Sequence, residues 1–200
     1  MPGLRPDEHV ATFCETDAEM ADAAAAYLLS AIDQGGAGVA IVTPEHERHI
    51  ERRFVGAGFD LAAARADGGY VVVDARAAID QVTTRGWPDP AAFWRTISPV
   101  IQRAGQDGQR PVRVFGEMVS LLWQADEFSA AMDVEALWTE LARQHRIALL
   151  CAYLGPGGLS PGGASLSGVI SGVVPEGVRP DAADELALLV AAHSRIAVGP

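Results

Sequence analysis

The sequence predicts an α/β fold with three layers, in which helices cover both faces of a mostly parallel central sheet. Apolar, β-branched runs alternate along the chain with segments of helical periodicity, as in consecutive strand-helix units. Several of these runs lack the in-and-out alternation of a half-exposed strand, so both of their faces are expected to be buried. The expected strands are residues 10–14, 38–43, 70–74, 112–115 and 147–153.

Helix signals lie between these runs. The first expected helix covers about residues 17–34 and begins with a capping box made by Thr16 and Glu19. The second follows the second strand, with Thr43 as its N-cap and Pro44 at its first helical position. Further helices are expected over residues 74–86, over 89–105 with a kink at Pro99, over 117–144 as two helices or one bent helix, and over 181–193.

Residues 155–180 are rich in Gly, Ser and Pro and form the one plausible long loop, which is either a lid or a slack connection. A chain of 200 residues with 49% hydrophobic side chains can bury one sizeable core. We therefore expect residues 1–200 to form a single domain.

The charge balance limits the classes of partner. The chain has a net charge of -11, and all 15 of its basic residues are Arg. Nucleic acid and anionic membranes bind basic surfaces, so neither is expected as a partner. No apolar run reaches the roughly 18 residues of a membrane span, and the N-terminus lacks a signal peptide, so we expect a cytoplasmic protein. The cysteines form no CxxC pair, and we expect no metal, no cofactor and no disulfide framework.

Ligands of open parallel sheets bind beyond the carboxyl ends of the strands. The residues expected there supply carboxylates, a thiol, a phenol and an imidazole, with little Arg: 15–17, 43–46, 74, 116–117 and 151–153. The first helix begins with Asp17 and Glu19, where a phosphate-binding loop would have glycines and a lysine. These acids are either ordinary helix caps or the sign of a nucleotide site that has been lost, and the missing lysine favours the second interpretation.

Two buried charges stand out. Arg113 lies within an apolar strand with Glu117 at its carboxyl end, and Glu135 falls within the apolar arc of its helix. Because a buried charge needs a partner, we expect Arg113 to pair with Glu135 or Glu117, and a purely structural salt bridge is the alternative to a functional role.

The histidines and Cys151 give weaker signals. His9 precedes the first strand and is expected at the end of the sheet away from the strand tips, which weakens it as a partner of Cys151. His46 lies at the third position of a helix, and for both histidines a structural or exposed role is the simpler interpretation. Cys151 lies late in a buried strand, where an inert, small apolar side chain is the default.

Five stretches together resemble the MEDS family, the methanogen/methylotroph, DcmR-type sensory domain of bacterial and archaeal signalling proteins. They are VATFCETDAEMADA, RVFGEMVSLLW, DVEALWTELA, IALLCAYL and AAHSRI. The resemblance runs from about residue 9 to residue 196. It implies a degenerate RecA/KaiC-like fold that lacks the phosphate loop (Walker A) of the active ATPases.

The resemblance also implies the binding of a small hydrocarbon derivative. The residues that match the family's positions are His9, Glu117, Glu135, Cys151 and Tyr153, and Thr43, His46 and Arg113 complete the expected ligand-binding set. No catalytic residue is assigned, and we expect a sensory domain rather than an enzyme.

The output is expected to be a partner protein, such as a histidine kinase or transcription regulator, because no output module is attached; a homodimer is a further candidate assembly. Two alternatives stay open. One is an enzyme with Glu117 as general acid or base, assisted by Cys151 or His9. The other is a regulator that binds only another protein through its acidic surface.

Overall fold

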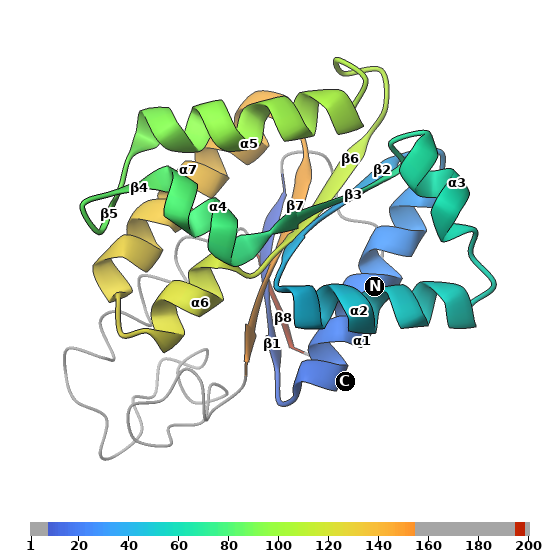
Figure 1. Ribbon diagram of the computed structural model, residues 1–200, viewed down its shortest axis with the longest axis horizontal. Coiled ribbons are helices and arrows are strands. Elements are labelled where there is room, and N and C mark those ends of the chain that lie inside the picture. Colours follow the sequence, from blue (N-terminus) through green and yellow to red (C-terminus); the bar gives the residue numbers. More distant parts are fainter. Residues whose placement is uncertain (1–7, 155–194, 199–200) are drawn as a thin grey trace.

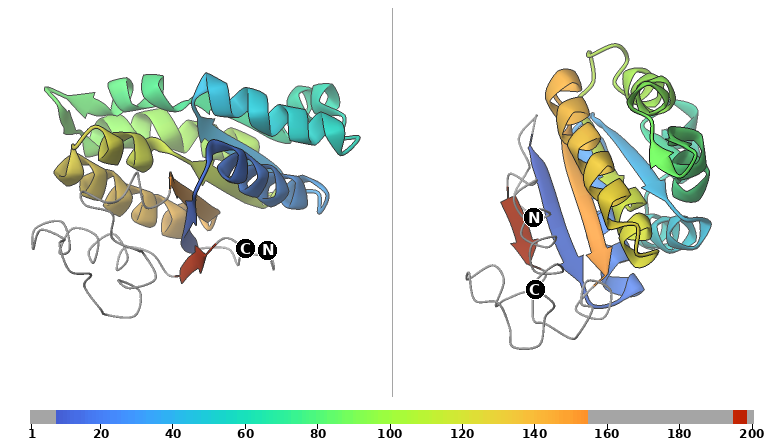
Figure 2. Two further views of the ribbon diagram at one scale, coloured as in Figure 1. Left: turned by 90° about the horizontal axis from the view of Figure 1, so that it is seen from below. Right: turned by 90° about the vertical axis from the view of Figure 1, so that its left-hand side faces the viewer.

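The central layer is a six-stranded sheet with the strand order β3-β2-β6-β7-β1-β8, in a computed structural model that describes residues 8–154 and 195–198. Every neighbouring pair in it is parallel. The strands are β1 (His9–Cys14), β2 (Ala37–Val42), β3 (Tyr70–Asp74), β6 (Val112–Gly116), β7 (Ala148–Leu154) and β8 (Arg195–Val198). The five predicted strands are confirmed. The short β8, which the sequence did not predict, extends the sheet beyond β1 (Figure 2).

Helices cover both faces of this sheet (Figure 1). One side carries α1 (Asp17–Ile32), α2 (Pro44–Gly56) and α3 (Leu61–Ala66). The other side carries α4 (Ala75–Val82), α5 (Pro90–Ala104), α6 (Met118–Gln124) and α7 (Phe128–His145). The predicted three-layer α/β class with a parallel sheet is therefore confirmed.

Alternate strand residues point into two separate cores. Val114 on β6 and Leu149 on β7 pack into the core beneath α4 to α7. Their neighbours Phe115 and Leu150 pack into the core beneath α1 to α3. Because successive side chains of a strand point to opposite faces, the parity of a strand residue decides which core its side chain joins.

The start of α1 is capped by its own side chains, as predicted. The Thr16 hydroxyl accepts a hydrogen bond from the Glu19 backbone N–H at 3.2 Å. The Glu19 carboxylate in turn accepts a hydrogen bond from the Glu15 backbone N–H at 2.8 Å. These oxygens occupy backbone donors that a phosphate would use at a helix N-terminus.

Several boundaries differ from the prediction. The helix expected over 74–86 ends at Val82, and the antiparallel pair β4 (Thr83–Thr84) and β5 (Trp87–Pro88) follows. Arg85 (φ 56°) and Gly86 (φ 82°) form its turn, and two consecutive left-handed residues suit a tight hairpin. The alternative of two helices over 117–144 is correct, because Asp126 (φ 60°) interrupts the helical path between α6 and α7.

The predicted loop 155–180 and last helix 181–193 lie outside the described residues, so the single-domain organisation stays a prediction. Within the described ranges, none of the helices combines the length and the apolar character needed to cross a membrane.

Candidate functional site

All of the predicted site residues except Arg113 fall into two polar groups. The first, which we call the edge site, consists of Asp17, Thr43, His46 and Glu117 at the carboxyl end of the sheet. The register of β2 and β6 pairs Ile41 with the last residue of β6, so the residues that follow these two strands emerge side by side. The edge where the sequence predicted a ligand therefore does bring polar side chains together.

In the edge site, the His46 imidazole lies between two carboxylates. Its Nδ1 is 2.5 Å from Glu117 Oε2, and its Nε2 is 3.2 Å from Asp17 Oδ1. The backbone N–H of Thr43 donates to the other oxygen of Glu117, and the Thr43 hydroxyl caps α2. Glu117 thus links the end of β2 to the first turn of α2.

Burial and charge act in opposite directions on His46. The His46 side chain is only 12% exposed, and burial by itself would lower its pKa. The hydrogen bond and charge of Glu117, followed by those of Asp17, outweigh burial and raise the pKa of His46 above its ordinary value. The site therefore favours the imidazolium form.

A pocket of about 480 Å³ opens over the edge site. Its walls combine polar and charged groups with a few apolar side chains, and they include Asp17, Met20, Thr43, His46, Arg76, Glu117, Ser120, Leu121 and Gln124. A concave site with convergent polar groups can hold and orient a small molecule.

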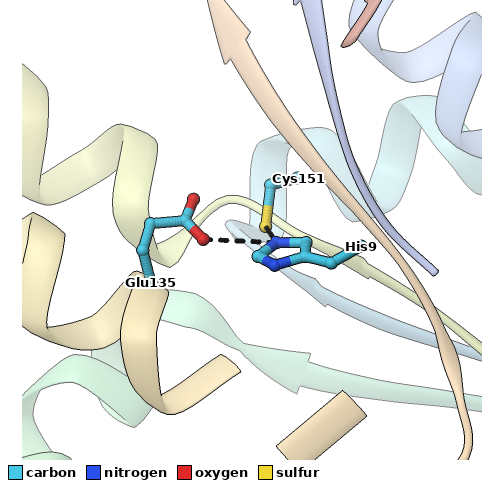
Figure 3. A group of neighbouring side chains, drawn as sticks. All are labelled: His9, Glu135 and Cys151. Atoms are coloured by element: carbon cyan, nitrogen blue, oxygen red, sulfur yellow. Dashed lines mark hydrogen bonds and ion pairs between the residues drawn. The ribbon is translucent and has the colours of Figure 1, made fainter. Parts of the chain in front are cut away.

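The second group, which we call the buried cluster, consists of His9, Glu135, Thr139, Cys151 and Tyr153, between α7 and the sheet. His9 Nε2 lies 3.2 Å from Cys151 Sγ and 3.2 Å from Glu135 Oε2, whose side chain reaches toward the ring from α7 (Figure 3). His9 Nδ1 is 3.0 Å from Thr139 Oγ1, and the Tyr153 hydroxyl donates to Glu135 Oε1.

Strand register explains the buried cluster and corrects one expectation. β1 and β7 are neighbours, and the register pairs His9 with Leu149 and Ala11 with Cys151. His9 and Cys151 have the same parity and face the same core, two residues apart along the ladder. His9 does lie at the start of β1, but the expectation that this position weakens it as a partner of Cys151 is wrong.

The protonation of the buried cluster follows from its burial. Burial, with the Glu135 charge as the next cause, raises the pKa of Cys151 well above its ordinary value. The same two causes raise the pKa of Tyr153. The thiol and the phenol therefore keep their protons, and Cys151 is not a nucleophile in this state.

The predicted pairing of Arg113 with Glu135 or Glu117 is also wrong. Arg113 has the parity of Phe115, so its side chain points toward α1, whereas Glu135 lies on the opposite face of the sheet. Its Nη1 donates to the Tyr27 carbonyl at 3.4 Å and to the Ser30 hydroxyl, and the guanidinium lies 5.5 Å from the centre of the Tyr27 ring. Arg113 joins neither polar group.

The enzyme alternative requires Glu117 beside Cys151 or His9, and the structure places them in different groups. Glu117 is bonded to His46 and Thr43, whereas Cys151 and His9 contact each other on one face of the sheet. The alternative of a regulator that binds only another protein stays a prediction.

Three residues of the pocket and the buried cluster were not among the predicted ligand-binding residues. Asp17 follows the first strand and belongs to the inventory of strand-end residues, so its position was a usable signal. Arg76 lies in the first turn of α4, which begins at the end of β3. Thr139 stands one helical turn after Glu135, and the i, i+4 spacing could have placed both on one face.

The fold and the polar groups define a parallel α/β domain with a pocket at the carboxyl edge of its sheet. The chain belongs to the MEDS family, since the family model described as "MEDS: MEthanogen/methylotroph, DcmR Sensory domain" matches residues 8–155. The resemblance stated from the sequence is thus confirmed, and the family description indicates a sensory role.

Among solved structures, the chain is similar to a KaiC-like protein from the hyperthermophilic archaeon Pyrococcus horikoshii OT3. The sequences are 17% identical and the TM-score is 0.49, over 76% of this chain and 65% of the other. This chain thus spans slightly less than two thirds of the length of that protein. A comparison with curated proteins gives no match.

Proposed function

We propose that this chain is a non-catalytic sensory domain that binds a small organic molecule, a hydrocarbon derivative with a polar group, in the edge site. The observation that carries the proposal is the pocket of about 480 Å³ over the imidazole and carboxylates of the edge site. It lies at the carboxyl end of a parallel sheet, where open α/β folds bind their ligands. The membership of a sensory family supports the same role.

The pocket walls suggest the chemistry of the ligand. Glu117 and His46 offer an acceptor and a charged donor, and Ser120 adds a hydroxyl. Met20 and Leu121 offer apolar surface for a short hydrocarbon part. A small alcohol, carbonyl compound, amine or carboxylate would use both kinds of wall, whereas a pure hydrocarbon would leave the polar groups unpaired.

The edge site also offers a route for a signal. Asp17 lies in the first turn of α1, His46 lies in the first turn of α2, and Glu117 immediately precedes α6. A ligand that replaces the contact between His46 and Asp17 would change how the starts of α1 and α2 are held. Such a difference in contacts is what allows a ligand to favour one conformation.

The receiver of the signal is proposed to be a partner protein, such as a histidine kinase or a transcription regulator. A homodimer of this chain is a second candidate assembly. The acidic composition of the chain, with a net charge of -11, favours a partner with a basic surface.

Native mass spectrometry of protein purified without added ligand tests binding first, because it reports bound small molecules and subunit number together. Ligand-observed NMR with a panel of small alcohols, aldehydes, amines and carboxylates then tests the chemistry. We expect at least one compound to bind, and we expect Glu117→Gln to weaken it by about tenfold or more, because a charge-assisted hydrogen bond is lost.

Glu140→Gln is the matched control, because Glu140 is exposed on α7. Within the part of the chain that the structure describes, its side chain pairs only with Arg143. This variant should leave binding unchanged. A panel without any binder, or equal loss in the two variants, would contradict the proposal.

A further inference from the structure

We propose that the buried cluster binds a divalent transition-metal cation, with Zn²⁺ as the best fit, through His9 Nε2, a carboxylate oxygen of Glu135 and Cys151 Sγ. These three ligand atoms come from β1, α7 and β7 and lie within 4.8 Å of one another. The proposal goes beyond the sensory function of the edge site and does not depend on it.

Two of the three separations between the ligand atoms are close to those of a tetrahedral centre. Metal-ligand bonds of about 2.0–2.3 Å place two ligand atoms roughly 3.3–3.6 Å apart in tetrahedral geometry. The distances from His9 Nε2 to Cys151 Sγ and to Glu135 Oε2 are both 3.2 Å. The imidazole nitrogen thus lies at the same short distance from the sulfur and from the carboxylate oxygen. A cation between the three atoms would bind all of them at once.

The neighbours of these ligands are placed as outer-shell partners of a metal would be. His9 Nδ1 faces Thr139 Oγ1 at 3.0 Å, which would fix the ring and leave Nε2 for the cation. The Tyr153 hydroxyl donates to Glu135 Oε1 and orients the carboxylate, whose other oxygen faces the imidazole. Hydrogen bonds of this kind orient histidine and carboxylate ligands in metalloproteins.

The charges balance when the cation is bound. A thiolate and a carboxylate carry two negative charges, which a divalent cation cancels while the imidazole stays neutral. On binding, the S–H bond of Cys151 breaks, the sulfur binds the metal, and the proton leaves for the solvent. Neutralisation would remove the cost of a carboxylate at Glu135, which has no exposed surface.

The ligand types select the class of cation. Sulfur and imidazole ligands suit Zn²⁺ and its tetrahedral analogue Co²⁺, whereas Mg²⁺ and Ca²⁺ prefer shells of oxygen ligands. Three protein ligands leave a fourth position for a water molecule or for the phenol oxygen of Tyr153.

The test uses the full chain without an affinity tag, stripped with a chelator and titrated with Co²⁺ and then Zn²⁺. We expect one Co²⁺ per chain, with the charge-transfer absorption of a cobalt-thiolate bond and the visible bands of tetrahedral cobalt. Zn²⁺ should displace the Co²⁺ and remove both signals. A pH indicator should register proton release when Zn²⁺ binds to the stripped protein.

The chain supplies its own control. Cys151→Ser should abolish the thiolate band, whereas Cys14→Ser should keep it, because Cys14 is buried in the other core beneath α1 to α3. Glu117→Gln should also keep the band, so that a failure of the edge-site proposal is distinguishable from a failure here.

X-ray absorption of the zinc-loaded wild-type protein gives a second readout that needs no variant to fold. One sulfur neighbour with nitrogen or oxygen neighbours is the expected result. A protein that binds neither Co²⁺ nor Zn²⁺, a shell without sulfur, or loss of the band in Cys14→Ser alone would overturn the proposal.

Discussion

The edge site and the buried cluster each place a histidine beside a glutamate, but they do so in opposite surroundings. His46 and Glu117 line an open pocket, and a second carboxylate, Asp17, is 55% exposed next to them. His9 is only 3% exposed and Glu135 is fully buried, between α7 and the sheet. The same pair of residue types therefore lines an open pocket in one place and is enclosed in a core in the other.

The chain builds the two groups by different geometric rules. The edge site collects residues that follow parallel strands, so their positions after the strands already place them at one edge of the sheet. The buried cluster collects alternate residues within neighbouring strands and one face of a helix, so it depends on register and parity. The first arrangement leaves side chains open to solvent, and the second encloses them in a core.

The largest expected effect comes from removing the carboxylate of the buried cluster. Glu135→Ala should lower the free energy of unfolding by about 3–5 kcal/mol, because it leaves the polar groups of His9 and Tyr153 facing a cavity. Urea denaturation followed by circular dichroism measures this change. The exposed Glu140→Ala should stay within about 0.5 kcal/mol of the parent. Equal losses of stability in the two variants would show that the contacts of Glu135 in the buried cluster do not stabilise the fold.

Replacing Arg113 should have a smaller effect and should leave both groups intact. Arg113→Met keeps much of the apolar stem but loses the bonds to Tyr27 and Ser30, so a loss of about 1–2 kcal/mol is expected. Small-molecule binding at the edge site and Co²⁺ binding in the buried cluster should both persist. A parallel loss of either binding activity would mean that Arg113 takes part in that site.

A smaller effect is expected in the pH dependence of stability. The raised pKa of His46 means that its protonated form favours the folded state, so its contribution is complete below the unfolded pKa of about 6.5. The contribution is lost as the pH rises through the higher pKa of the folded state. The stability difference between the parent and His46→Gln should therefore shrink from about pH 6 to pH 8.

Urea denaturation across this pH range measures the difference. Histidines outside the edge site cancel in the comparison of the two proteins. A difference that grows with pH would contradict the proposed stabilisation of the imidazolium by Glu117 and Asp17.

The smallest expected effect is that of ATP with Mg²⁺ on the melting temperature, where no increase is expected. Thr16 and Glu19 already accept hydrogen bonds from the backbone at the start of α1, and the acids there repel phosphate. A ligand raises the melting temperature when it binds the folded state with a dissociation constant well below the ligand concentration. A clear increase with ATP would show that the start of α1 still binds nucleotides.

The sequence allowed the architecture and the edge site to be predicted for a physical reason. Apolar runs without alternation mark buried strands, and the polar residues that follow them must gather at one edge of a parallel sheet. Thr43, His46 and Glu117 were therefore found without knowledge of strand order. Membership of the MEDS family was also visible in the sequence and is confirmed.

The partners inside the cores could not be predicted in the same way. His9 meets Cys151 only because β1 and β7 are neighbours in a particular register, and no local pattern in either strand encodes that pairing. The face that Arg113 occupies depends on which helices cover which side of the sheet. Strand order and helix placement are long-range properties of the chain, so buried charges were assigned to the wrong partners.

The central claim is that the edge site, and not the buried cluster, receives the small organic molecule. Amide chemical-shift mapping in a ¹H–¹⁵N spectrum tests it directly, with a compound that binds in the ligand panel. The account predicts that the largest shifts occur at residues 17, 43, 45, 46 and 117–121, with little change at residues 9, 135 and 151. Shifts concentrated around Cys151 and Tyr153 would contradict it.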